Sequence, residues 1–378
     1  MSVWDDVVGQ DRAVAVLAAA ATDPAAMTHA WLVTGPPGSG RSNAARAFAA
    51  ALQCPDGGCG RCAECTTVLA GTHADVTVVA TEKVTLSIDE VRDLITVAQR
   101  APAGGRWRVI IVEDADRMVE RTSNVLLKAI EEPPERTVWV LCAPSPEDVV
   151  VTIRSRCRRV GLRVPPVADV AALLVARDGA DPSVADAAAR AAQSHIGLAR
   201  RLARDPEARA RRSRTLELAA GVRGVGDAVL TAAELVEVAT AEAKAATADR
   251  DAAEKAELLR SLGADGGGTL PPALRAQVRQ LEEEQKRRAT RAQRDVLDRT
   301  LVDLLSFYRD VLVVQLGAQV ELVNSEHAEL VATVARGSTP EQTVRRMDAI
   351  GETRERLEGN VAPLLAMEAM AVALRPQG

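Results

Sequence analysis

The hydrophobic pattern of the chain changes near residue 160. Before that point, continuous apolar runs such as Val109-Ile110-Ile111-Val112 alternate with amphipathic stretches, and from Pro165 onward the pattern is helical. Continuous apolar runs of about four to eight residues are typical of strands buried on both faces of a parallel sheet. Strands that alternate with helices predict an α/β fold in which helices cover both faces of the sheet.

The same pattern gives the individual elements. Buried strands are expected at residues 29–34, 75–80, 108–112 and 137–142, and helices at 11–21, 43–52, 88–99 and 123–132. Ser87 and Glu90 form a capping-box sequence at the start of the third helix, and Pro133-Pro134 ends the fourth. A further strand is entered through the basic segment Arg154-Ser155-Arg156-Cys157-Arg158-Arg159.

The remaining chain is expected to fold into two helical domains. We expect an α/β domain at 1–163, a small helical domain at 164–207 and an all-helical domain at 208–378. In the last of these, Gly266–Gly268 and Pro271-Pro272 mark a flexible break, and Gly317 ends a long helix over 274–316. Arg287, Arg291 and Arg294 share one face of that helix. A solvated charged face is the default interpretation, and contact with nucleic acid is the alternative.

Composition narrows the class of protein. The chain of 378 residues is 47% hydrophobic and 26% charged, which is ordinary for a soluble globular protein with two or three domains. Aromatic residues are only 2% and the net charge is −5, so any nucleic-acid contact must be a local basic patch that does not rely on base stacking. Without a signal peptide or a membrane-length apolar run, we expect a cytoplasmic protein without disulfides.

A glycine-rich loop follows the first expected strand. Its sequence has the spacing of a phosphate-binding P-loop, in which backbone N–H groups and a helix N-terminus face an anion. The lysine of that pattern is replaced by arginine, whose wide planar fork is not equivalent to a compact ammonium group. Either the loop binds ATP through this arginine, with Ser42 holding Mg²⁺, or it is an inherited turn with weak or no nucleotide binding, which we favour. The candidate residues are Gly35, Pro36, Gly38, Ser39, Gly40, Arg41 and Ser42.

Four cysteines follow the helix after this loop. Cys54, Cys59, Cys62 and Cys65 have the spacing C-x4-C-x2-C-x2-C, with glycines between them. Four thiolates at this spacing are typical of a tetrahedral structural Zn²⁺ site, which leaves no open position for catalysis. Disulfides and a redox pair are the less favoured alternatives in an intracellular protein. Cys142 and Cys157 are interpreted as buried or incidental.

Two further groups of charged residues carry candidate chemistry. Glu113 and Asp114 follow a buried strand, where P-loop proteins place the acids that hold Mg²⁺ and polarise the attacking water. Their order is Glu-Asp, so the length of each side chain differs by one methylene from the usual residue at its position. The alternative interpretation is an acidic strand end without a catalytic role. The basic segment 154–159 is either a solvated turn or the source of an arginine offered to a phosphate on another subunit.

Taken together, these motifs resemble the bacterial clamp-loader subunits of the AAA+ class. The resemblance covers about residues 3–205 and rests on the P-loop, the cysteine insert and four short motifs: Val8-Gly9-Gln10, Leu126-Leu127-Lys128 with Glu131-Glu132-Pro133-Pro134, Ser155-Arg156-Cys157, and Gly197-Leu198-Ala199-Arg200. It implies an AAA+ parallel sheet with a zinc insert, a helical lid and a C-terminal collar. It further implies that Val8 and Gly9 lie at the nucleotide, that Arg156 is an arginine finger acting in trans, and that Arg200 is the sensor arginine.

Departures from the family pattern indicate a particular role. Motor subunits keep the P-loop lysine, an Asp-Glu pair and a polar residue after the fourth strand, where this chain has Arg41, Glu113-Asp114 and Ala143. This pattern is similar to delta-prime subunits of DNA polymerase III, which often do not hydrolyse ATP. The resemblance implies a hetero-pentamer with gamma/tau and delta subunits that loads the sliding clamp on primer-template DNA. The alternatives are an active ATPase motor subunit and a zinc-dependent DNA-binding or scaffolding protein with a degenerate P-loop.

Overall fold

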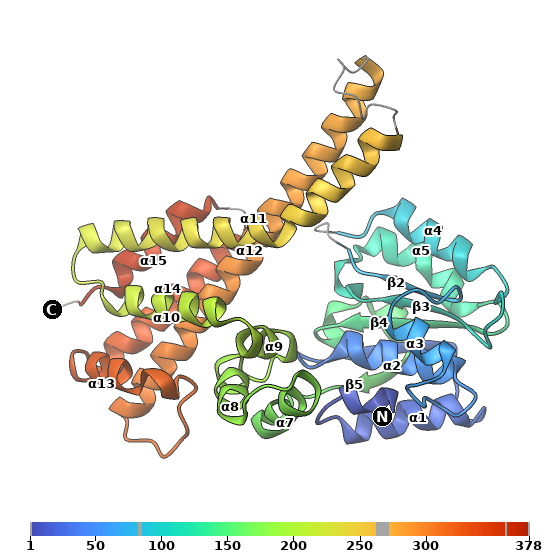
Figure 1. Cartoon of the computed structure of the whole chain (residues 1–378), viewed down its shortest axis with the longest axis horizontal. Coiled ribbons are helices and arrows are strands. Elements are labelled where there is room, and N and C mark those ends of the chain that lie inside the picture. The colour runs from blue at the N-terminus through green and yellow to red at the C-terminus, as the bar shows by residue number, and fades with distance from the viewer. Residues whose placement is uncertain (1, 82–84, 262–271, 360, 377–378) are drawn as a thin grey trace. The chain divides into compact units, whose positions relative to one another are not determined.

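The chain forms two compact units, residues 1–204 and 205–378 (Figure 1). The structure is a computed structural model and describes residues 2–81, 85–261, 272–359 and 361–376. The glycine break at 266–268 and Pro271 therefore lie outside the described residues.

The first unit is built on a five-stranded, wholly parallel sheet. The strands are β1 (Ala30–Thr34), β2 (Val76–Val79), β3 (Arg108–Val112), β4 (Thr137–Ala143) and β5 (Arg158–Gly161). Their order across the sheet is β2-β3-β4-β1-β5, so the strand that leads into the glycine-rich loop lies between β4 and β5. All five carboxyl ends therefore lie at one edge of the sheet, and the glycine-rich loop lies at that edge.

Helices cover both faces of this sheet, as Figure 1 shows. On one face, Trp31, Val33 and Ile111 pack with α1 (Asp11–Thr22), α2 (Arg41–Gln53) and α3 (Ala63–Leu69). On the other face, Leu32 and Ile110 pack with α4 (Ile88–Ala98) and α5 (Glu120–Glu131). Neighbouring residues of one strand thus enter opposite cores, which explains why the central strands β1, β3 and β4 are apolar along most of their length.

Shorter elements complete the first unit. The 3₁₀ helices are η1 (Val3–Asp6), η2 (Ala115–Arg117) and η3 (Pro146–Asp148), and a short helix α6 (Val151–Arg154) precedes β5. Three helices follow the sheet: α7 (Val167–Asp178), α8 (Pro182–Ala191) and α9 (Ile196–Arg204). We refer to α7–α9 as the three-helix segment.

The second unit is helical throughout its regular structure. It contains α10 (Pro206–Ala220), α11 (Val225–Ser261), α12 (Pro272–Gln315), η4 (Ser325–His327), α13 (Ala328–Arg336), α14 (Pro340–Glu358) and α15 (Pro363–Leu374). Its core is centred on α12, where Leu297, Leu301, Leu304 and Phe307 are fully buried. The long helices α11 and α12 lie side by side, and their joined ends extend well beyond the other helices of this unit (Figure 1).

The α/β fold class with a parallel sheet, a four-cysteine cluster and a helical C-terminal region is confirmed. The expected capping box at Ser87 and Glu90 is also present. Three details of the sequence interpretation were wrong or incomplete. Helix α3 was not expected, α5 begins at Glu120 rather than at Ser123, and residues 318–324 form a non-helical connection instead of continuous helix.

Candidate nucleotide cradle and metal centre

The glycine-rich loop keeps the backbone shape of a phosphate cradle. It leaves the carboxyl end of β1 and enters α2, for which Gly40 is the N-terminal cap. Gly38 and Gly40 have φ angles of +83° and +89°, a region that residues with a side chain rarely adopt. The loop glycines thus place a helix N-terminus where an anion would bind.

The charged side chain of the loop is turned onto the loop itself. Nη1 of Arg41 donates a hydrogen bond to the carbonyl oxygen of Gly35, the first residue of the loop. Ser39 is buried against Gly35, and its hydroxyl has no hydrogen-bond partner among the described residues. Arg41 therefore has to break a contact with the loop backbone before its guanidinium group can face a phosphate.

Both acids after β3 have protein partners. The Glu113 carboxylate forms an ion pair of 3.0 Å with Arg46 of α2. The Asp114 carboxylate accepts a hydrogen bond of 3.0 Å from the backbone N–H of Thr81, and it lies 3.7 Å from the Arg117 guanidinium. A carboxylate that holds the water shell of Mg²⁺ has to keep its oxygens available, whereas these two are used within the protein.

The three-helix segment closes over the loop. Together they line a cavity of about 350 Å³, with Gly38 and Arg41 on one side and His195 and Arg200 on the other. A Cβ atom at Gly38 would lie 2.6 Å from Cα of His195, so the two backbones are in direct contact. Arg200 reaches the cavity wall but is paired with the buried Asp178 at 2.9 Å.

An unusual backbone turn positions His195. Gln193 and Ser194, which precede it, have φ angles of +48° and +64°. Left-handed backbone at residues with a side chain is uncommon and costs on the order of 1 kcal/mol or more each. Strain of this kind persists only where the surrounding packing holds it. Here the strained turn places His195, at the start of α9, in contact with Gly38.

The N-terminal motif ties the loop to the connection after β5. Nε2 of Gln10 donates to the carbonyl oxygens of Ser39 at 3.3 Å and Arg163 at 2.7 Å, and Oε1 of Gln10 accepts from the N–H of Arg163 at 3.1 Å. Gly9 has a φ of +68°, and a Cβ atom there would lie 3.0 Å from Pro166. Val8 is half-buried. The motif thus holds the start of the three-helix segment next to the loop.

Arg156 lies at the opposite end of the sheet from the loop. It precedes β5, and the pairing of Trp31 with Arg158 places it beside the amino end of β1. Its guanidinium group pairs with Glu131 at 2.6 Å and donates to the carbonyl of Thr152 at 2.8 Å, while 40% of the side chain stays exposed. The structure thus brings Arg156 together with the end of α5, not with the loop of its own chain.

The four expected metal ligands converge. The sulfur atoms of Cys54, Cys59, Cys62 and Cys65 all lie within 4.8 Å of one another, and the Sγ atoms of Cys54 and Cys62 are 3.7 Å apart. Four sulfurs at about 2.3 Å from a zinc ion in a tetrahedron are about 3.8 Å apart, so the cluster fits this ion. Backbone N–H groups of Arg61 and Cys62 lower the pKa of Cys59 to about 6, whereas burial raises the pKa of Cys65, so a bound cation is needed to hold all four side chains as thiolates.

Glycines shape the loop that carries the cysteines. Gly57, Gly58 and Gly60 all have positive φ angles. A Cβ atom at Gly58 would lie 2.6 Å from Cγ2 of Val3, and the Gly58 carbonyl accepts a hydrogen bond of 3.1 Å from the Val3 N–H. The cysteine loop thus binds the N-terminal 3₁₀ helix η1, which leads directly into the Val8-Gly9-Gln10 motif.

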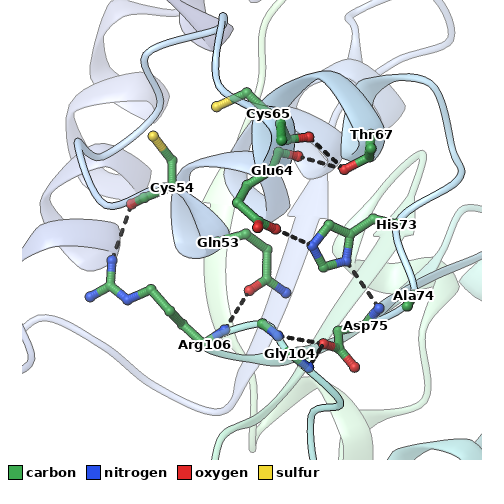
Figure 2. Close-up of polar contacts among 12 residues, drawn as sticks. Gln53, Cys54, Glu64, Cys65, Thr67, His73, Ala74, Asp75, Gly104 and Arg106 are labelled. Carbon is green, nitrogen blue, oxygen red and sulfur yellow. Dashed lines mark hydrogen bonds and ion pairs between the residues drawn. The ribbon is translucent and has the colours of Figure 1, made fainter.

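A polar network joins the cysteine loop to the edge of the sheet (Figure 2). Oε1 of the buried Gln53 accepts a hydrogen bond of 2.9 Å from the N–H of Arg106, and Nη1 of Arg106 donates to the carbonyl of Cys54 at 3.1 Å. Beside it, Nε2 of His73 lies 2.6 Å from the carboxylate of Glu64, a residue that stands between Cys62 and Cys65 in the sequence. These contacts orient the backbone that presents the thiols.

Asp75 is the charged centre of this network. It is 1% exposed and accepts hydrogen bonds from the N–H groups of Ala103, Gly104 and Gly105 at 2.7, 3.0 and 2.6 Å. The Arg108 guanidinium is 2.9 Å away. Burial alone would raise the pKa of Asp75, but these N–H groups and the Arg108 charge lower it below its usual value. Neither Asp75 nor His73 stood out in the sequence, because their partners are defined only by the fold.

Comparison with known proteins shows where the chain has relatives. The model of a family described as "DNA polymerase III, delta subunit" matches residues 9–166. A DNA polymerase III subunit gamma/tau of Mycobacterium tuberculosis is 35% identical over 174 residues, which cover 45% of this chain and 30% of that protein. A DNA polymerase III subunit delta′ of Pseudomonas aeruginosa is 40% identical over 136 residues, which cover 34% of this chain and 41% of that protein. The matches thus span less than half of each of these relatives.

The solved structures that the chain matches include a DNA polymerase III gamma subunit-related protein from Thermotoga maritima. It is 16% identical, with a TM-score of 0.39 over 91% of this chain and 93% of that one. Among the described residues, no helix has the length and apolar character needed to cross a membrane. The family match and the sequence relatives agree with the glycine-rich loop and the cysteine cluster, and they show that residues 9–166 of this chain are similar to DNA polymerase III subunits of the gamma/tau and delta′ types.

Proposed function

We propose that this chain is a delta-prime-like subunit of the clamp loader, which assists loading of the sliding clamp on primed DNA without hydrolysing ATP itself. The observation that carries the proposal is the state of the cradle. Arg41 is bonded to the Gly35 carbonyl, and Glu113 is neutralised by Arg46. The Asp114 carboxylate accepts a hydrogen bond from the Thr81 N–H. A hydrolysing site needs its cation on the phosphates and its acids on the metal and the water, so these three internal contacts would have to break first.

The position of Arg156 supports a role at a neighbouring subunit. It lies at the amino ends of the strands, whereas the cradle of the same chain lies at the carboxyl ends. An arginine finger has to touch the phosphate that is being transferred, so Arg156 can serve only a nucleotide bound by another subunit. Glu131 orients the guanidinium group while leaving it partly exposed.

The remaining parts fit the same assembly. The three-helix segment would act as the AAA+ lid, and residues 208–378 would form the collar that joins five subunits. Gamma/tau and delta subunits, the sliding clamp and primer-template DNA would be the partners. The four cysteines would hold one structural Zn²⁺ that stabilises the loop next to η1.

One observation favours the second candidate, an active ATPase of the gamma/tau type. The loop backbone has the shape of a phosphate cradle, and the adjoining cavity of about 350 Å³ is lined by Arg41, Ser42 and Arg200. Nucleotide binding is therefore the property that separates the two candidates.

The first test is a calorimetric titration of the whole chain with Mg·ATP. We expect no binding by the natural chain, because Arg41 is engaged with Gly35 and the three-helix segment contacts Gly38. An Arg41→Lys variant, with a compact ammonium group, tests whether the arginine alone is responsible. Tight binding by the natural chain, followed by turnover in the assembly, would reject the proposal in favour of the second candidate.

The second test replaces Arg156 in a clamp loader reconstituted from this chain and its gamma/tau and delta partners. We expect Arg156→Gln to lower ATP turnover at the one site that Arg156 completes by about 10³-fold, and so to lower the ATPase rate of the assembly, without preventing assembly. Arg159→Gln is the matched control, because Arg159 is an exposed arginine of the same segment. Equal ATPase rates for the two variants would contradict the finger assignment.

A further inference from the structure

The outer part of the α11–α12 hairpin has a different construction from the rest of the second unit. The buried hydrophobic residues end at Ala243 in α11 and begin at Val296 in α12. Residues 244–261 and 272–295 continue beyond them as two paired helices that extend from the bundle (Figure 1). At about 1.5 Å per residue, eighteen residues of α11 reach about 27 Å past the core. We refer to these two segments as the outer hairpin.

Ion pairs hold the outer hairpin together. Arg288 of α12 faces α11 and pairs with Asp251 at 2.8 Å and with Glu254 at 3.0 Å. Lys255 of α11 pairs with Glu282 of α12 at 2.7 Å. The charged residues between the two helices are therefore paired within the hairpin. The charged residues on the outer side of the hairpin take no part in these pairs, so holding the two helices together does not explain them.

The outer part of α12 carries an excess of positive charge. Residues 272–295 contain seven Arg or Lys and four Asp or Glu, a net charge of +3 in a chain whose net charge is −5. The ten residues 285–294 contain five Arg or Lys and no acid. We call the outward-facing basic residues of α12 the basic face; they are Arg275, Arg279, Lys286, Arg287, Arg291 and Arg294.

The basic face forms continuous rows along the helix. At about 100° per residue, Arg287, Arg291 and Arg294 lie within about 60° of one another. Lys286 and Arg287 are exposed, and neither they nor Arg294 form an ion pair with another residue in the described part of the chain. Side chains of this kind are available to a polyanion, because no carboxylate has to be displaced first.

We propose that the basic face of α12 binds the phosphate backbone of DNA. Arg287 to Arg294 spans about 10 Å of helix, comparable to three successive phosphates at about 3.4 Å of axial rise per strand. The outer hairpin contains no aromatic residue, so the contact reads charge and not base identity. DNA is chosen over other polyanions because residues 9–166 match the model of a DNA polymerase III subunit family. The inference does not depend on whether the chain hydrolyses ATP.

The test measures how the full-length chain binds a fluorescent DNA duplex at several salt concentrations. In the natural chain, we expect the affinity to fall steeply with salt, as counterion release requires. The variant Lys286→Gln/Arg287→Gln/Arg294→Gln should bind at least tenfold more weakly. The slope of log affinity against log salt should flatten by about 2.7, since each lost phosphate contact contributes about 0.9.

Two controls separate a local contact from the effect of net charge. Glu283→Gln/Glu284→Gln removes acids that adjoin the basic face, and it should tighten binding. Arg223→Gln/Arg336→Gln/Arg345→Gln removes three exposed arginines of the second unit outside the outer hairpin, and it should leave binding within twofold of the natural chain. Circular dichroism should show unchanged helix content in all three variants.

Several results would overturn the proposal. One is that the natural chain does not bind the duplex at low salt. Another is that the two triple variants weaken binding equally. Vesicles containing phosphatidylserine serve as a further probe. If they bind the basic face while the duplex does not, the surface recognises a membrane and not DNA. None of these outcomes bears on the Mg·ATP titration, so the two proposals fail separately.

Discussion

Replacing Asp75 by asparagine tests how strongly the cysteine loop is anchored to the sheet. The carboxylate accepts three backbone hydrogen bonds from residues 103–105 and pairs with Arg108, all in a site that is 1% exposed. Asparagine keeps one acceptor oxygen and puts an NH₂ group where the second oxygen accepted from Gly104 and Gly105. The new NH₂ group would then face the N–H donors of Gly104 and Gly105 in a buried site, and the Arg108 guanidinium would lose the carboxylate charge that pairs with it.

The expected cost follows from these contacts. Breaking a buried ion pair by removing one partner costs about 3–5 kcal/mol of unfolding free energy. Arg108 also donates to the carbonyl oxygens of Ala74 at 2.9 Å and Ala101 at 2.8 Å, so its guanidinium group stays partly satisfied. We therefore expect the lower end of the range, a loss of about 3 kcal/mol for Asp75→Asn.

Tryptophan fluorescence during urea unfolding is a suitable assay. The four tryptophans, Trp4, Trp31, Trp107 and Trp139, all lie in the first unit, so the signal reports that unit alone. Asp93→Asn is the matched control, because Asp93 is exposed on α4 and its replacement should change the free energy of unfolding by less than about 0.5 kcal/mol.

The pH dependence gives a second, independent readout. The pKa of Asp75 is lowered in the folded state, so its stabilising contribution is complete above the unfolded-state value of about 3.9 and is lost as the pH falls through the folded-state value. The difference between the natural chain and Asp75→Asn should be constant from pH 7 to pH 5 and should shrink below about pH 4. A difference under about 1 kcal/mol at pH 7, or one that stays constant down to pH 3, would refute the reasoning.

Three further predictions concern the metal, the cradle and the second unit. Metal analysis should find about one Zn²⁺ per chain with thiolate ligation, and Cys59→Ser should lower that content and increase amide exchange in residues 54–65; metal-free natural protein would contradict the assignment. Gly38→Ala should speed amide exchange in α9, because the new Cβ atom would lie 2.6 Å from Cα of His195, whereas Gly104→Ala, with open space around its Cβ position, should not. Asp310→Ala should destabilise the second unit by about 3 kcal/mol, measured by amide exchange in α12, because the buried Asp310 accepts from the backbone N–H of Asn324 at 2.7 Å; unchanged exchange would argue against that role.

The order of strands and helices was predictable because it depends on local pattern. A strand covered on both faces is apolar along most of its length, and β3 and β4 show this in the sequence itself after their first residues, Arg108 and Thr137. The capping box at Ser87 and Glu90 uses groups only three residues apart, so its sequence already contains both partners. Helix α3 was missed because its seven residues, which include Cys65, are too few to show a helical period.

The candidate chemistry was predictable where spacing alone defines it. Cysteines with four, two and two residues between them are forced close together by the short chain that joins them, so the cluster of Cys54, Cys59, Cys62 and Cys65 could be expected. The glycine-rich loop was likewise expected, and its positive φ angles at Gly38 and Gly40 explain why glycine stands there. These features require only short stretches of chain.

By itself, then, the sequence determined the sheet-and-helix plan, the cysteine cluster and the loop. Only the tertiary structure decided what each charged group contacts. Glu113 meets Arg46 from 67 residues away, and the backbone next to Gly38 comes from His195 in the three-helix segment. Such pairs depend on strand order and helix packing, which bring distant segments together, and the pattern of a single segment does not contain them. The same holds for the outer hairpin, since only the folded bundle shows where the core ends and the charged helices continue alone.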